Sequence, residues 1–199
     1  MKKKLLSISL AVIVAVMAIS GASLAWLQDT TQTVTNTFTE GKVDIDLYEH
    51  DYLPDSNTLD TESKVTANND YKMIPGKVLP KNPTVVVKAG SEACYVFVKV
   101  EKVNDVATFL EYDIDTSVWT ALNGYEGVYY KEITNYTAED TELNVLKNKV
   151  VTVKSDVEMS DMNGLTENTR PQLKFTAYAI QQLGFDDAVT AWAKIMPNP

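Results

Sequence analysis

The residue types that could support catalysis gather around the only histidine of the chain. His50 lies between Glu49 and Asp51 in the stretch YEHDYLPD. A zinc protease of the H-E-x-x-H type needs two histidines one helical turn apart, and a Ser-His-Asp triad needs its histidine buried beside a serine. The sequence contains no G-x-S-x-G, P-loop or G-x-G-x-x-G pattern. We therefore expect no catalytic site, and we expect His50 to be a solvated loop residue.

Four carboxylates around this stretch could attract a cation: Asp44, Asp46, Glu49 and Asp51. Their order lacks the D-x-[DN]-x-[DN]-G spacing of a dedicated calcium loop. We therefore expect no bound cofactor and at most a weak association with calcium. A solvated acidic face is the alternative interpretation of the same residues.

Cys94 is the only cysteine of the chain, so no intramolecular disulfide can form. It belongs to the stretch EACYVFVKVEKV, in which Cys94, Val96, Val98 and Val100 fall on one face of a predicted strand. A free cysteine among apolar neighbours behaves as a small buried hydrophobe. We expect Cys94 to pack in a core rather than to act as a nucleophile.

The beginning of the chain has the pattern of a secretion signal. Three lysines at positions 2–4 precede an apolar run over 5–19, and small residues follow. Ser23 and Ala25 supply the small side chains of an A-x-A-like cleavage site, which predicts cleavage after Ala25 and a new N-terminus at Trp26. An uncleaved membrane anchor is the alternative, although the apolar run is short for a spanning helix.

Removal of a signal peptide over residues 1–25 leaves 174 of the 199 residues and lowers the formal net charge from −9 to −12, because three lysines are lost. We expect a leader over residues 26–41 and one β-sandwich domain over residues 42–199. A strongly acidic chain argues against nucleic acids and anionic membrane surfaces as partners. We expect a secreted protein of the extracellular matrix or the cell surface.

Alternation of apolar and polar residues with a period of two dominates the sequence and predicts strands. Val43, Ile45 and Leu47 share one face of the first strand. The turn-rich stretch over 49–70 predicts a long mobile loop, and the stretch over 105–114 fits a helix or a strand. Further strands are predicted over 84–90, 94–103, 127–133, 149–159 and 172–180.

The stretch GFDDAVTAWAKIM predicts one helix near the C-terminus. Asp186 or Asp187 is its candidate N-cap, and Val189, Trp192 and Ile195 lie on one face. Many short strands and little helix predict an all-β fold. We expect a jelly-roll-like two-sheet antiparallel sandwich with a short C-terminal helix.

The stretch TVTNTFTEGKVDIDL has strand-forming residues almost at the mature N-terminus. Phe38 and Val43 have opposite parity, so a turn or bulge at Glu40-Gly41 is needed to restore one apolar face. We interpret 33–38 as a donor portion that pairs with a neighbouring subunit, and 42–48 as the first strand of the domain. A leader folded back on its own subunit and a disordered leader are the alternatives.

The stretch LAWLQDTTQTVTNTFTEGKVDIDL, over 24–47, spans the predicted cleavage site and the start of the mature chain. It resembles the TasA/camelysin family of secreted proteins of Gram-positive bacteria. That family has an A-x-F-x-D-like stretch after the cleavage site and then an N-T-F-x-x-G-x-[LV]-x-[IL] segment. The stretches at 73–100 and 171–195 are similar to the central strands and the C-terminal strand and helix of such proteins. The N-terminal patterns are filled by Trp26, Leu27 and Asp29, and by Asn36, Thr37, Phe38, Gly41, Val43, Ile45 and Leu47.

The resemblance implies a jelly-roll subunit of biofilm-matrix fibres, processed by a SipW-type signal peptidase during export and partnered by itself and by an accessory anchor protein. Growth of the fibre would use donor-strand exchange, a head-to-tail form of β-augmentation. A monomeric surface or binding module of the same fold is the alternative, and a camelysin-type metalloprotease is a second one. The expected assembly segment comprises Trp26, Leu27, Asp29, Val34, Asn36, Thr37, Phe38 and Gly41.

Overall fold

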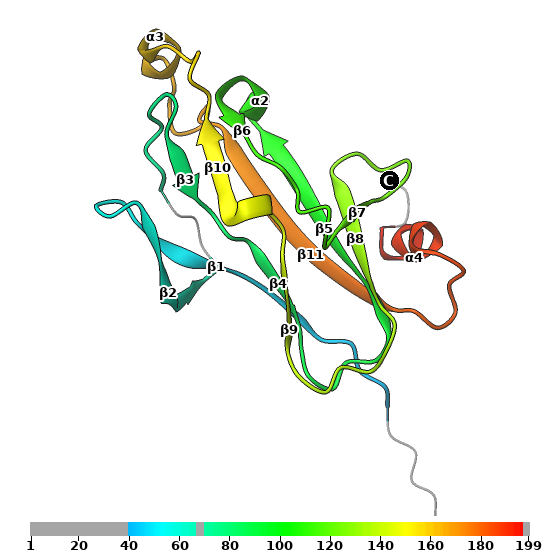
Figure 1. Ribbon diagram of the computed structural model, residues 1–199. Helices are drawn as coiled ribbons and strands as arrows, with labels where there is room; N and C mark the ends of the chain where they lie inside the picture. The colour runs from blue at the N-terminus through cyan, green and yellow to red at the C-terminus, as the bar shows by residue number, and fades with distance from the viewer. Residues whose placement is uncertain (1–39, 67–69, 197–199) are drawn as a thin grey trace, which may run out of the picture. The chain divides into compact units, whose positions relative to one another are not determined.

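The computed structural model describes residues 40–66 and 70–196, and the elements below lie within this part of the chain (Figure 1). Three short helices are α2 (Val106–Phe109), α3 (Met159–Asn163) and α4 (Ala188–Ile195), and a 3-10 turn, η1, covers Lys147–Lys149. The strands are β1 (Ile45–Leu53), β2 (Thr58–Val65), β3 (Val78–Pro80), β4 (Thr84–Val87), β5 (Cys94–Val103), β6 (Leu110–Glu111), β7 (Thr120–Ala121), β8 (Val128–Ile133), β9 (Thr141–Asn144), β10 (Val150–Val153) and β11 (Gln172–Gln181).

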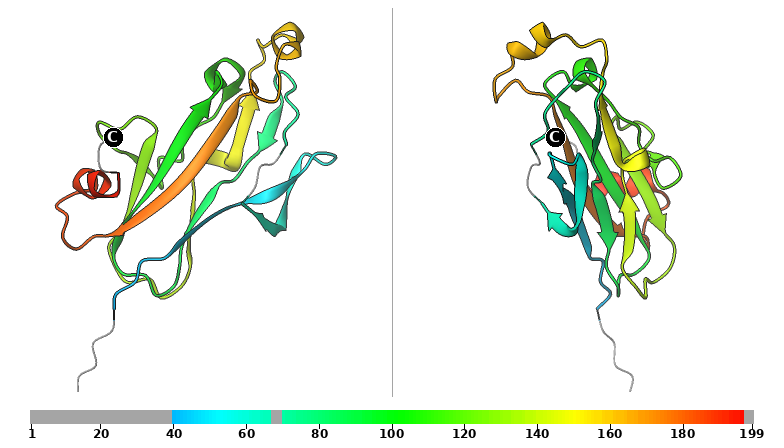
Figure 2. Two further views of the ribbon diagram at one scale, coloured as in Figure 1. Left: turned by 180° about the vertical axis from the view of Figure 1, so that it is seen from behind. Right: turned by 60° about the vertical axis from the view of Figure 1, so that its left-hand side comes forward.

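The strands form two facing layers, and their ladders are antiparallel. One layer is the sheet β11-β5-β8-β7. The other consists of the sheets β2-β1-β4-β9 and β3-β10-β6, which the chain joins because β3 leads into β4 and β9 leads into β10 (Figures 1 and 2). The all-β, jelly-roll-like sandwich with a short C-terminal helix that the sequence predicts is therefore confirmed.

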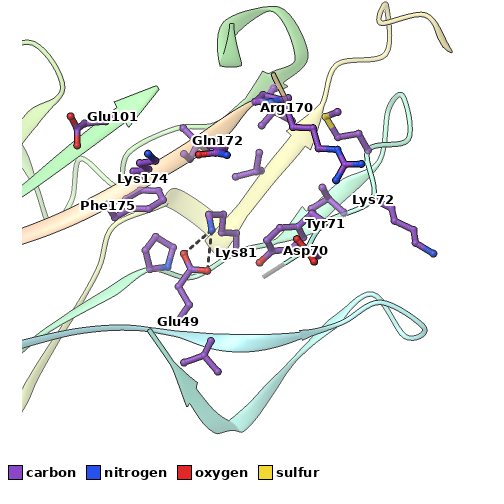
Figure 3. A pocket seen from close by; sticks show the side chains of 18 of the residues that line it. Glu49, Asp70, Tyr71, Lys72, Lys81, Glu101, Arg170, Gln172, Lys174 and Phe175 are labelled. Carbon is purple, nitrogen blue, oxygen red and sulfur yellow. Dashed lines mark hydrogen bonds and ion pairs between the residues drawn. The ribbon is translucent and has the colours of Figure 1, made fainter. Parts of the chain in front are cut away.

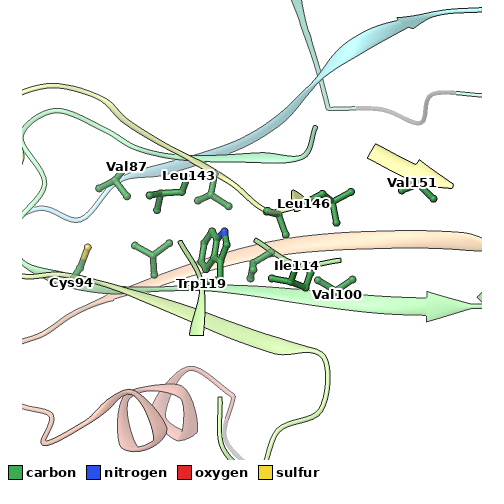
Figure 4. Close-up of a cluster of buried hydrophobic side chains, with 12 residues drawn as sticks. Val87, Cys94, Val100, Ile114, Trp119, Leu143, Leu146 and Val151 are labelled. Carbon is green, nitrogen blue, oxygen red and sulfur yellow. The ribbon is translucent and has the colours of Figure 1, made fainter. Parts of the chain in front are cut away.

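The inner face of β5 supplies much of the core between the layers. Cys94, Val96 and Val98 are fully buried there, and they face Val87 of β4 and the indole of Trp119 in one apolar cluster (Figure 4). The predicted period of two along β5 is the reason for this, because alternate side chains of a strand point to opposite faces. Cys94 is a core residue, as expected.

The outer face of β5 is also buried, because α4 covers it. Tyr95 and Phe97 pack there against Trp192, whose ring centroid lies 5.1 Å from that of Phe97. The helix begins where predicted, since the Asp187 carboxylate accepts a hydrogen bond from the Thr190 N–H at 2.8 Å. We refer to this surface of the sheet as the covered face.

Several predicted elements differ from the structure. The stretch over 49–70 is not a long loop: it holds the end of β1 and the whole of β2, which form a hairpin. The strand predicted over 149–159 ends at Val153 and is followed by α3. β3, β7 and β9 were not predicted, because strands of two to four residues are too short to show a periodic pattern.

Within the described residues, no helix has both the length and the hydrophobicity needed to cross a bilayer.

Candidate functional site

A cleft with a volume of about 1290 Å³ lies between the first half of β11 and the strands β1 and β3 (Figure 3). Its apolar lining comes from both layers of the sandwich. Five consecutive residues of β11, over 172–176, line the cleft, so it borders the edge of that strand and not only one of its faces. The main apolar side chains are Leu47, Leu79, Leu110, Val151, Leu173 and Phe175.

The edge of β11 that borders the cleft pairs with no other strand in the described part of the chain. The N–H of Gln182 donates to the carbonyl of Ala93 at 2.9 Å, in continuation of the β11–β5 ladder. Because such bonded positions alternate along an antiparallel ladder, Leu173, Phe175 and Ala177 direct their backbone N–H and C=O groups away from β5. This long unpaired edge, which we call the open edge, offers a template for another strand.

One ion pair lies in the cleft among these apolar groups. Lys81 Nζ is 2.7 and 3.0 Å from the two carboxylate oxygens of Glu49, and both side chains are about 85% buried (side-chain exposure 14% and 15%). The ammonium group also lies 5.3 Å from the ring centroid of Tyr71 and 5.5 Å from that of Phe175. The bend between β3 and β4 positions Lys81, and β1 positions Glu49 just after it leaves β4.

The charges that line the cleft balance, in contrast to the acidic chain as a whole. The formal net charge of the whole sequence is −9. Four basic and four acidic side chains line the cleft, so its formal charge is zero: Lys72, Lys81, Arg170 and Lys174, and Glu49, Asp70, Glu101 and Glu167. An uncharged segment therefore fits this cleft electrostatically better than a charged one.

Three of the four carboxylates that were candidates for calcium form ion pairs with lysine side chains. Lys42 Nζ lies 2.7 Å from Asp44 Oδ2, and Lys88 Nζ lies 3.3 Å from Asp46 Oδ2. Lys88 also bridges to Asp140 at 2.8 Å, and this hydrogen bond raises the pKa of Lys88 and lowers the pKa of Asp140. Asp44 and Asp46 each form an ion pair with a lysine ammonium group.

Glu49 belongs to the cleft ion pair, and Asp51 stands apart from the other candidates on β1. The Asp51 N–H donates to Ser63 Oγ of β2 at 2.7 Å. Within residues 40–66 and 70–196, no group of three potential metal ligands comes together. The four acidic residues therefore do not form one cluster in this structure.

The expectation that His50 is a solvated loop residue was wrong. His50 lies within β1 and is half-buried. Asn82 Nδ2 donates to His50 Nδ1 at 2.6 Å, and the His50 N–H donates to Asn82 Oδ1 at 3.1 Å. Its ring meets that of Tyr48 edge-on, with the centroids 5.4 Å apart. Through these contacts His50 links β1 to the bend between β3 and β4.

Cys94 has the environment of a structural thiol. Its side chain is fully buried among valines, and burial raises the pKa of the thiol to about 11. The reactive thiolate is therefore disfavoured at neutral pH.

Most of the predicted leader and signal residues lie outside the described residues: Ser23, Ala25, Trp26, Leu27, Asp29, Val34, Asn36, Thr37 and Phe38. Gly41 is described and lies beside the Glu92 side chain. The N–H of Glu92 donates to the Lys42 carbonyl at 2.8 Å, and the N–H of Lys88 donates to the Asp44 carbonyl at 2.9 Å. The first strand thus continues its pairing back to residue 42.

Sequence reasoning did not find the cleft. The strand predicted over 172–180 is confirmed as β11, and its residues Leu173, Phe175, Ala177 and Ala179 pack against the core. No sequence signal showed that this strand is an edge, or that Lys81 meets a carboxylate 32 positions away.

Comparisons with known protein families, with curated proteins and with solved structures find no match for this chain.

Proposed function

We propose that this protein is a secreted, non-enzymatic subunit of extracellular matrix fibres, in which the leader of one subunit adds a strand to the next. The observation that carries the proposal is the open edge of β11, which borders a cleft with an apolar lining and no net charge. The stretch over 30–39, TTQTVTNTFT, has no charged side chain and alternates in the manner of a strand. The resemblance of the N-terminal segment to the TasA/camelysin family supports the same function.

The two ends of the domain favour a head-to-tail assembly. Lys42, next to the leader, pairs with Glu92, and the adjacent Ala93 pairs with Gln182 just after β11 ends. The cleft borders residues 172–176, which lie at the opposite end of that strand from Gln182. A leader that leaves one subunit can therefore enter the cleft of the next, and repetition of this step gives an open chain.

The direction of the chain distinguishes donation from folding back. A leader from a neighbour enters at the start of β11 with its earliest residues deepest in the cleft, so it runs antiparallel to β11. A leader folded back on its own domain runs toward Lys42 and is therefore parallel to β11. Antiparallel ladders are slightly more stable per residue, and the ladders of this domain are antiparallel. Donation is the arrangement that keeps the sheet antiparallel.

The expected free energy of exchange is modest. Val43, Ile45 and Leu47 already pack against the core of their own domain, so Val34 and Phe38 are the donor's remaining large apolar residues in the stretch over 30–39. Burying these two side chains contributes about 3–6 kcal/mol, and each ladder hydrogen bond adds about 0.5–1.5 kcal/mol. The lost freedom of a subunit costs about 4–15 kcal/mol. We therefore expect filaments only above a threshold concentration.

Deletion of residues 26–38 from the mature protein tests the donor. We expect the filaments seen by electron microscopy to disappear and size-exclusion chromatography to show a folded monomer. Unchanged filaments would show that the leader is not the donor. A wild-type protein that stays monomeric at every concentration would instead favour the monomeric surface module.

A matched pair of proline variants tests the acceptor. Thr176→Pro removes an N–H that bonds to β5, whereas Ala177→Pro removes one that points to the open edge. We expect Thr176→Pro to lower the free energy of unfolding by about 1–3 kcal/mol, because a ladder hydrogen bond is lost, and Ala177→Pro to retain most of the stability but lose filaments. Filaments of normal length from Ala177→Pro would contradict pairing at this edge.

A further inference from the structure

The Lys81–Glu49 ion pair is a largely buried pair of charges, and the rings of Tyr71 and Phe175 lie beside its ammonium group. Burying two charges is costly, and an apolar pair of similar size is often equally stable or more so. The best-attested use of a polar group at an apolar interface is to fix register, because the wrong alignment leaves it facing an apolar side chain. Phe175 lies beside the pair on the open edge, so any strand added there must pass the ammonium group.

The donor segment carries one polar side chain on its apolar face. In TVTNTFT, residues Val34, Asn36 and Phe38 have the same parity, and threonines occupy the other parity. A side-chain amide both donates and accepts hydrogen bonds, so Asn36 can satisfy an ammonium group and a carboxylate together.

We propose that the Lys81–Glu49 pair fixes the register of the incoming strand by holding Asn36 opposite Phe175. This inference rests on the proposed function, because it presupposes that the leader enters the cleft. It adds the alignment and the residues that select it.

Parity and direction determine the other partners in this register. The donor runs antiparallel to β11, and its inward residues oppose the positions whose backbone groups point outward. Phe38 then lies opposite Leu173, where Leu110 and Met162 also line the cleft. Val34 lies opposite Ala177, a small residue on the inner face of β11. A shift by two residues would place Phe38 or Val34 against the ion pair.

Engineered cysteines can measure the register directly, in a Cys94→Ala background. Thr37 would lie opposite Lys174, whose own N–H bonds to β5, so the two form a non-hydrogen-bonded pair with Cα atoms about 4.5 Å apart. This distance permits a disulfide. The matched control pairs Thr35→Cys with Lys174→Cys, two residues out of register and about 7–8 Å apart.

We expect the Thr37→Cys/Lys174→Cys protein to give a ladder of cross-linked oligomers on non-reducing gels, in about tenfold higher yield than the control, since a misaligned buried polar group costs roughly one factor of ten. Equal yields from the two pairs, or filaments without any cross-link, would overturn the register while the fibre proposal stands. Cross-linked monomers alone would overturn both, because the leader would then fold back on its own domain.

Apolar replacement of the ion pair tests its role in selection. Lys81→Met with Glu49→Leu should still give filaments, but the two cysteine pairs should then cross-link with similar yields. In a cleft with the native ion pair, Asn36→Leu should raise the threshold concentration for filaments about tenfold, and in the apolar cleft it should not. Because Asn36 lies in the leader, this comparison does not depend on how the domain tolerates the cleft substitutions. An unchanged preference for the Thr37 pair in the apolar cleft would show that the ion pair does not set the register.

Discussion

The two outer edges of the β11-β5-β8-β7 sheet are built in opposite ways. At one edge, β7 has only two residues, and the adjacent Trp119 is buried and donates from its indole to the Asn144 carbonyl at 2.8 Å. At the other edge, β11 has ten residues and borders the cleft. Proteins usually shorten or cover sheet edges, because a long free edge recruits other strands. One edge of this sheet is therefore protected in the usual way, and the open edge is not.

On the covered face, the side chains of the sheet are packed against a helix. Trp192 contacts Tyr178 of β11 and Tyr125 as well as Phe97, with ring centroids 5.3, 6.3 and 5.1 Å away. The open edge has the same kind of apolar residues, but Phe175 is only half-buried. β11 is thus covered by α4 on its outer face, whereas its edge has no pairing strand in the described part of the chain.

The largest effect that we expect is from truncation on the covered face. Trp192→Ala should lower the free energy of unfolding by about 3–5 kcal/mol, the cost of a large aromatic removed from a packed site. Phe175→Ala should cost only about 1–2 kcal/mol in the monomer, because its side chain is already partly exposed. Urea unfolding at neutral pH measures both values.

The effects of the same two variants on filament assembly should have the opposite order to their effects on stability. Phe175→Ala should raise the threshold concentration for filaments, whereas Trp192→Ala should leave it unchanged at temperatures where the domain stays folded. Equal losses of stability from both variants would show that the open edge is as well packed as the covered face.

The sequence predicted β5 and α4 correctly because each of them follows a regular local pattern of residues. Cys94, Val96 and Val98 alternate with Tyr95 and Phe97, so both faces of β5 could be assigned from the pattern. The N-cap of α4 followed from local chemistry in the same way. Each of these features depends on residues close together in the sequence.

β2, the open edge and the Lys81–Glu49 ion pair depend on contacts between residues far apart in the sequence, and the sequence did not predict them. β2, over Thr58–Val65, has no fully buried residue, so its pairing with β1 shows only a weak apolar pattern in the sequence. Alternation along β11 shows which side chains point inward, but it does not show whether a neighbouring strand exists. The meeting of Glu49 with Lys81 is likewise a consequence of the fold.

An intermediate effect is expected from the Cys94 thiol, which lies on the inner face of β5 in the core between the layers. The pKa of Cys94 is raised by burial to about 11, so its neutral form stabilises the fold fully below the unfolded pKa of about 8.5. This stabilisation should be lost as the pH rises from about 9 to 11, by about 1–3 kcal/mol in total. Unfolding measured at pH 7, 9 and 10.5 should show a steeper decline for the wild type than for Cys94→Ala. Parallel declines would show that water reaches the thiol in the folded state.

The smallest effect is expected from calcium, which would have to bind among the carboxylates near Lys88. Asp46 and Asp140 share Lys88, so a calcium ion would have to displace an ammonium group. A site with a dissociation constant of about 10 mM contributes roughly 0.1 kcal/mol at 1 mM calcium, which shifts the melting temperature by less than about 0.5 °C. Lys88→Met leaves both carboxylates without their cation, and only this variant should respond to calcium more than to magnesium. A specific shift of several degrees in the wild type would contradict this expectation and show that these carboxylates form a calcium site despite the ion pairs with Lys88.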